Sequence, residues 1–164
     1  MHPHASANNS GRKALHGLVF AKYGDLAAST RQRFVQAQPY LAAENITLTI
    51  RPLLDNHYLA TLFQHGTRKP THIAAAYARR LLQLFQCRDY DFILVQYELF
   101  PYLPAGFESL LRLTGKPVFY DMDDAMFHQY DAHPKAWVRR LLGKKLVPLL
   151  RQSRIAFCGN AYLA

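Results

Sequence analysis

The chain has 164 residues, half of them hydrophobic, with eight Gly and nine Pro. This length and composition exclude a largely disordered protein and suit one folded domain with a substantial core. Twenty Lys and Arg against eleven Asp and Glu give a formal net charge of +9, which favours anionic partners such as phosphates, nucleotides, anionic lipids or nucleic acids. We expect a disordered basic arm over residues 1–14 and a folded domain over residues 15–164.

The chain carries no hydrophobic run near the ~18 residues that a membrane-spanning helix needs. The segment from Met1 to Gly17 is polar and lacks the apolar part of a secretory signal. Cys87 and Cys158 stand far apart and show no metal-ligand spacing, so we expect reduced thiols. These features predict a cytoplasmic protein, either soluble or attached peripherally to the inner membrane surface.

The first predicted strand covers Leu15 to Ala21, and a helix is expected after it over residues 26–43. The turn between them, Tyr23-Gly24-Asp25, is typical of an anion site, because free N–H groups at a helix start point into such a turn. Side chains that could add donors and positive charge to this site are Ser29, Thr30, Arg31 and Arg33. The alternative is an ordinary turn between strand and helix, since one glycine is a weak signal.

The middle of the chain is predicted to hold a strand over 46–53, a short helix over 56–64, a basic loop over 66–70 and a longer helix from Thr71 to about Gln86. The clearest buried strand follows over Tyr90 to Tyr97. It ends in the polar group Gln96-Tyr97-Glu98, and a helix over 104–112 comes next. A polar cluster therefore stands at the carboxyl end of a buried strand.

A second acidic cluster follows the short apolar run Val118 to Tyr120, which predicts another buried strand. Its three carboxylates are Asp121, Asp123 and Asp124. Ligands of open α/β sheets bind outside the carboxyl ends of the strands, so these acids are the best candidates for site chemistry. The alternative is that an Asp here caps the next helix through its side-chain oxygen.

The last third of the chain begins with a loop over 125–133 that is rich in aromatic residues and His. A basic amphipathic helix is expected from Pro134 to about Leu149, with Pro148 ending or kinking it. It could pack on the sheet or lie on an anionic membrane with Trp137 at the interface. We expect a final strand over 154–158 and the start of another helix from Gly159.

Strands and helices alternate at spacings that suit right-handed crossovers and a parallel sheet. We therefore predict an α/β fold, a Rossmann-like three-layer sandwich with a mostly parallel sheet. In such a sheet the ends of three strands, near Gly24, Glu98 and Asp121, converge on one edge. This convergence predicts a ligand site there.

Two interpretations of the acidic cluster are disfavoured by the sequence. A metal site could use oxygen and nitrogen atoms of Asp121, Asp123, Asp124, His128 and His133, but their spacing matches no known metal loop, so we expect none. The run Phe-Tyr-Asp-Met-Asp-Asp-Ala resembles the first motif of haloacid dehalogenase phosphatases. Ala125 stands where that family has Thr or Val, and too little chain follows for its later motifs.

From about Leu18 onward the chain resembles the amino-terminal half of a family 4 (group 1) glycosyltransferase of the GT-B fold. The similar segments are the Tyr23-Gly24 turn with Ser29-Thr-Arg-Gln-Arg33, then Val95-Gln-Tyr-Glu98, Gly115-Lys-Pro-Val-Phe-Tyr-Asp-Met-Asp-Asp-Ala-Met-Phe127 and Phe157-Cys-Gly-Asn-Ala-Tyr-Leu163. The resemblance implies two Rossmann-like domains, of which this one would bind the acceptor. The donor domain, with its paired glutamates, is absent from this sequence.

The resemblance implies a transferase that moves a sugar from a nucleotide-sugar donor to a glycan or lipid-linked acceptor, without a metal or cofactor. It assigns substrate-binding roles to Tyr23, Gly24, Ser29, Arg31, Arg33, Glu98 and His128. The candidates for catalysis, through hydrogen bonding or activation of an acceptor hydroxyl, are Asp121, Asp123, Asp124 and His133. The chain alone is expected to show little turnover.

The alternative function is a non-catalytic module, which would pair with a separate donor-domain chain or dock on a membrane through the helix after Pro134. Nucleic-acid binding is not expected, because the basic residues are spread over several helices and form no recognisable motif.

Overall fold

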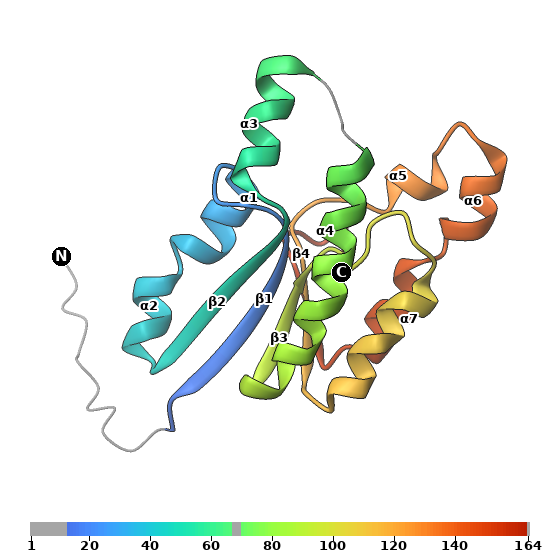
Figure 1. Cartoon of the computed structure of the whole chain (residues 1–164). Helices are drawn as coiled ribbons and strands as arrows, with labels where there is room; N and C mark the ends of the chain where they lie inside the picture. The colour runs from blue at the N-terminus through green and yellow to red at the C-terminus, as the bar shows by residue number, and fades with distance from the viewer. Residues whose placement is uncertain (1–12, 67–69, 164) are drawn as a thin grey trace.

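The fold is built on five parallel strands in the order β2-β1-β3-β4-β5 (Figure 1). The computed structural model describes residues 13–66 and 70–163, so most of the predicted arm and the centre of the predicted basic loop lie outside the described residues. The strands are β1 (Leu15–Tyr23), β2 (Ile46–Leu54), β3 (Phe92–Gln96), β4 (Val118–Met122) and β5 (Ile155–Cys158). The predicted Rossmann-like α/β sandwich with a parallel sheet is confirmed.

Helices connect every pair of consecutive strands (Figure 1). Between β1 and β2 these are α1 (Ala28–Thr30), the π-helical turn η1 (Arg31–Val35) and α2 (Gln38–Ala43). The others are α3 (Asn56–His65), α4 (Pro70–Gln83), the 3-10 helices η2 (Leu84–Asp89) and η3 (Ala105–Thr114), α5 (His128–Asp131), α6 (Ala136–Leu142) and α7 (Leu146–Gln152).

Two predicted long helices are wrong as single elements. The helix expected over 26–43 forms α1, η1 and α2. The break between η1 and α2 is explained by Pro39, which has no N–H to continue the helical ladder and stands in the first turn of α2. The helix expected from Pro134 is divided into α6 and α7 by the segment 143–145. Pro148 does not end a helix; it lies in the first turn of α7, where its missing N–H needs no helical partner.

Three further predictions are corrected in detail. The helix expected over 104–112 is the 3-10 helix η3, the predicted loop over 125–133 contains α5, and the chain from Gly159 forms turns in place of a helix start. The helix expected from Thr71 to about Gln86 is also divided: α4 ends at Gln83, and the 3-10 helix η2 continues to Asp89. These differences are local and leave the sheet unchanged.

The direction of each crossover decides which face of the sheet a helix covers. The step from β1 to β2 runs one way along the sheet, and all later steps run the other way. Right-handed crossovers therefore place α1, η1 and α2 on one face and the later crossover helices, α4 and α7 among them, on the other. Helices α3, α5 and α6 project beyond the carboxyl ends of the strands (Figure 1). The larger core lies on this second face, around Leu18, Phe20, Ile93, Val95 and Leu149, and a smaller one, with Val19, Ala21 and Phe34, lies on the first.

The connections leave β1 and β3 in opposite directions, although these strands are neighbours. Such a switch point opens a crevice at the carboxyl ends of the strands, where ligands of open α/β sheets bind.

Among the described residues, no helix is long and apolar enough to cross a membrane.

Candidate functional site

The turn after β1 is closed by hydrogen bonds from several sides. The Gly24 N–H donates to the Leu54 carbonyl at 3.1 Å. The Asn56 side chain accepts from the Leu26 N–H at 3.2 Å and donates to the Asp25 carboxylate. A Cβ on Gly24 would lie 2.1 Å from Asn56 Oδ1, so a side chain at this position would displace the Asn56 amide from the turn.

The predicted anion site at this turn has weaker support than its sequence pattern indicates. Helix α1 passes after three residues into the π-helical turn η1, and no side chain caps its start. The exposed Arg31 guanidinium donates to the carbonyl of Asp25 at 3.1 Å and thereby closes the turn. Roles for Tyr23, Ser29 and Arg31 in binding a substrate stay predictions.

Thr30 and Gln96 connect the ends of β1 and β3. The Thr30 hydroxyl donates to the Tyr23 carbonyl at 2.9 Å and lies 3.4 Å from Gln96 Oε1, which also accepts from the Lys22 N–H. Gln96 is fully buried, and its Nε2 has no hydrogen-bond partner among the described residues. The sequence analysis did not assign Gln96 a site role, although a polar residue in a buried strand was a usable signal.

Arg33 and Asp121 form a two-point ion pair across the site. Arg33 Nε donates to Asp121 Oδ2 at 3.0 Å, and the terminal guanidinium nitrogen Nη2 donates to Oδ1. The hydrogen bond to the Asp121 carboxylate raises the pKa of Arg33, while partial burial opposes the shift. The structure thus brings together two residues that the sequence analysis placed in different parts of the site.

Tyr97 holds an uncommon backbone conformation at the end of β3. Its φ is +61°, a left-handed value that costs a non-glycine residue on the order of 1–3 kcal/mol. Its N–H donates to the Asp121 carbonyl at 3.0 Å, and its side chain is buried. Burial, followed by the influence of the nearby Asp123 carboxylate, raises the pKa of the Tyr97 hydroxyl. Strain of this kind is concentrated at functional sites, and sequence reasoning missed it.

Asp123 is half-buried, and its Oδ1 is buried without a hydrogen-bond partner among the described residues. The turn after β5 packs against its backbone, since a Cβ on Gly159 would lie 3.0 Å from the Asp123 carbonyl oxygen. Asp124 is exposed, and its Oδ1 accepts from the Ala125 N–H at 2.7 Å. Neither acid caps α5, whose start has no side-chain cap.

Glu98 is engaged in a buried ionic cluster. Its carboxylate accepts from the Tyr130 hydroxyl at 2.7 Å, from Gln129 at 3.0 Å and from Lys145 Nζ at 2.5 Å. The Lys145 side chain is fully buried and also donates to the Phe100 carbonyl. A substrate could not reach Glu98 without displacing these partners, so this geometry favours a structural role for it.

Glu108 completes the same cluster. Its two oxygens accept from the N–H groups of Leu99 and Phe100, both at 2.9 Å, and Oε1 lies 3.4 Å from Lys145 Nζ. Burial raises the pKa of Glu108, although Lys145 opposes the shift. Two carboxylates and one ammonium group thus hold the loop after β3 against the segment between α6 and α7.

The two predicted site histidines have different surroundings. His128 Nδ1 lies 2.9 Å from the Asp131 carboxylate, and its Nε2 lies 2.8 Å from the Tyr162 hydroxyl. His133 Nδ1 accepts from the Lys135 N–H at 3.1 Å, at the start of α6. Within residues 13–66 and 70–163, no three His, Cys, Asp or Glu side chains are placed to hold a metal ion.

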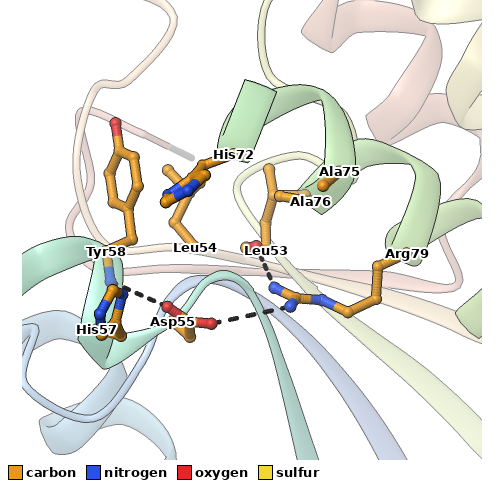
Figure 2. Close-up of a pocket in the computed structure, with 9 residues that line it drawn as sticks. All are labelled: Leu53, Leu54, Asp55, His57, Tyr58, His72, Ala75, Ala76 and Arg79. Carbon is orange, nitrogen blue, oxygen red and sulfur yellow. Dashed lines mark hydrogen bonds and ion pairs between the residues drawn. The ribbon is translucent and has the colours of Figure 1, made fainter. Parts of the chain in front are cut away.

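Two cavities lie beyond the end of β2, on either side of Asp55. One of about 240 Å3 separates α3 from α4, and Figure 2 shows His57 and Tyr58 from α3 and His72 from α4 on its wall. Asp55 caps α3 by accepting from the Tyr58 N–H and pairs with Arg79 at 3.8 Å, so these charges satisfy each other (Figure 2). The other cavity, of about 450 Å3, reaches Gly24 and Thr30 and therefore adjoins the switch point.

Comparison of the chain with models of known protein families and with curated protein sequences gives no match. The resemblance to family 4 glycosyltransferases therefore rests on the motifs quoted above.

Proposed function

We propose that this chain is the acceptor-side domain of a GT-B glycosyltransferase, which helps to transfer a sugar from a nucleotide-sugar donor to a glycan or lipid-linked acceptor. The observation that carries the proposal is that two of the buried polar atoms without a hydrogen-bond partner among the described residues stand at the carboxyl ends of neighbouring strands: Gln96 Nε2 at the end of β3 and Asp123 Oδ1 just after β4. One is a donor and the other an acceptor, beside the charged pair of Arg33 and Asp121. A buried polar atom without a partner is costly, and a ligand that supplies one removes that cost.

A sugar hydroxyl is a suitable ligand because it both donates and accepts hydrogen bonds. In the proposed reaction, the acceptor oxygen forms the new glycosidic bond while the bond from the sugar to the nucleoside diphosphate breaks, and the diphosphate leaves with the bonding electrons. Asp123 accepts the proton of the acceptor hydroxyl, or holds that hydroxyl, during this step. Arg33 offsets negative charge near the leaving diphosphate. A second domain would hold the nucleotide sugar, and this chain needs no metal or cofactor for its part.

The test is a titration of the 15N-labelled chain with hexyl glucoside and with maltose, followed by backbone amide shifts. We expect shifts at Gln96, Tyr97 and Asp123, and at least a tenfold weaker affinity in Asp123→Asn. The matched control is Asp89→Asn, which changes an exposed acid at the end of η2. Absence of shifts at these amides at millimolar ligand, or equal affinities in both variants, would count against the proposal.

Membrane docking is a second candidate function, favoured by one specific feature of α6. Val138 and Leu142 are buried, but Trp137 and Leu141 remain 63% and 57% exposed on the same helix. Exposed cationic side chains surround them: Lys135, Arg139, Arg140 and Lys144. An exposed Trp and Leu within a basic surface are typical of helices that lie on anionic membranes.

The chain contains one Trp, so its fluorescence reports on α6 directly. With vesicles of phosphatidylserine and phosphatidylcholine at low salt, we expect a blue shift of Trp137 emission. High salt should abolish the shift, because screening removes the attraction between the basic side chains and the anionic lipids. A charge-reversed Arg140→Glu, Lys144→Glu variant should abolish it at low salt, because two positive charges become negative. Unchanged emission with anionic vesicles at low salt would exclude this docking mode.

A further inference from the structure

A pocket of about 280 Å3 lies behind the acidic loop that follows β4. Its wall is formed by residues from β4, from the loop after β4 and helix α5, from the segment joining α6 to α7, from α7 and from the turn after β5. Six of these residues are apolar: Met122, Phe127, Leu146, Val147, Leu150 and Leu163. Met122 and Leu146 are buried core residues, while Val147 is 47% exposed, so the pocket runs from solvent towards the core.

Charged side chains complete the lining of this pocket. They are Asp124, Asp131 and Lys144, all of them exposed. Asp131 is paired with His128 at 2.9 Å, which leaves Asp124 as the carboxylate that adjoins the proposed acceptor site. A ligand here must have an apolar part for the wall and a polar part for Asp124 and Lys144, since binding pockets combine apolar walls with a few oriented polar groups.

We infer that this pocket binds the apolar substituent of an amphipathic acceptor, an alcohol or glycoside whose hydroxyl lies at Asp123 or Asp124. The inference rests on the proposed function for the hydroxyl and on the pocket for the apolar group. Asp124 belongs both to the acidic loop and to the lining of the pocket, and it directly follows Asp123 in the chain. A hydroxyl bound at Asp124 therefore has its substituent next to the pocket, and a hydroxyl at Asp123 is one residue away along the chain.

The size of the pocket limits the apolar group. With a volume of about 280 Å3, the pocket is much smaller than a long lipid chain requires. A short alkyl chain or one ring with a small substituent fits, whereas a long lipid chain would extend past Val147 into solvent or into a membrane.

The experiment measures dissociation constants of methyl, butyl and hexyl glucoside by amide shift titration of the full chain. Burial of each added methylene should tighten binding about two- to fourfold. Val147→Trp should fill the pocket and remove this dependence on chain length. Its matched control is Tyr40→Trp, which places a new Trp at an exposed position on α2, on the other face of the sheet.

The outcomes separate the pocket from the proposed transfer chemistry. A dependence of affinity on chain length that disappears in Val147→Trp and persists in Tyr40→Trp supports the pocket. Normal binding of all three glucosides by Asp123→Asn would weaken the proposed function but not the pocket inference. Equal affinities for the three glucosides, or the same dependence in both Trp variants, overturn the pocket inference. Shifts at Gln96 and Asp123 without chain-length dependence would retain the proposed function and remove the pocket.

Discussion

Arg33 and Asp121 are 88 positions apart in the chain, and their two-point ion pair joins η1 to the end of β4. The strand between β1 and β4 is β3, so the pair crosses the switch point. The Asp121 side chain is 5% exposed and that of Arg33 is 34% exposed. The pair therefore shapes the site edge and stabilises the packing of η1 on the sheet.

Replacing Asp121 with Asn should destabilise the fold by about 1–3 kcal/mol, because Arg33 loses a charged partner that is held in a largely buried position. Urea unfolding measures this change. Arg31→Gln is the matched control in the same helical segment, η1. Arg31 is exposed, and among the described residues its side chain bonds only to backbone carbonyls, so its loss should cost about 0.5 kcal/mol. Equal effects of the two substitutions would show that the ion pair does not stabilise the fold.

Glu108 should make stability depend on pH. Burial raises its pKa in the folded state, so the folded protein binds more protons than the unfolded chain at pH values above the ordinary Glu pKa, about 4.3. Its contribution is fully present below that pH and is lost as pH rises through the folded pKa. Urea unfolding from pH 4 to 8 should show wild-type stability falling relative to Glu108→Gln. The readout is the slope of the free energy of unfolding against pH, and the exposed control Asp89→Asn should not change that slope.

Gly24 and Gly106 make a matched pair for testing the turn after β1. Alanine at Gly24 would push the Asn56 amide away and should cost about 1–3 kcal/mol. Alanine at Gly106 meets no atom within 4 Å and should be neutral or slightly stabilising. Thermal unfolding gives both values. A combined Gly24→Ala, Asn56→Ala protein should lose less than the sum of the single changes; strict additivity would contradict the contact.

The two thiols should differ in reactivity. Both are free; Cys87 is fully buried and Cys158 is half-buried. Burial raises the pKa of Cys87 to about 11, so at pH 8 almost none of it is the reactive thiolate. A dithionitrobenzoate assay should therefore titrate Cys158 alone in the folded chain and both thiols in urea. Rapid reaction of the folded Cys158→Ser variant would contradict the burial of Cys87.

The sequence by itself determined the alternation of strands and helices, and with it the parallel sheet. Apolar runs such as Phe92–Gln96 and Val118–Met122 are local signals, and right-handed crossovers leave few ways to connect them. The acids after β4 could also be placed at the carboxyl edge, because parallel strands all end at the same side. Local pattern and general topology were sufficient for these features.

Only the tertiary structure decided which polar residues meet at that edge. Glu98 comes shortly after β3, and Asp121 stands near the end of β4. Glu98 is nevertheless buried against Lys145, 47 positions away, whereas Asp121 pairs with Arg33. Neither partner is visible in the local sequence, and the left-handed backbone of Tyr97 likewise has no local signal. Such contacts depend on long-range packing, because the stabilising partner of a buried charge is chosen by proximity in the folded chain and not by spacing along it.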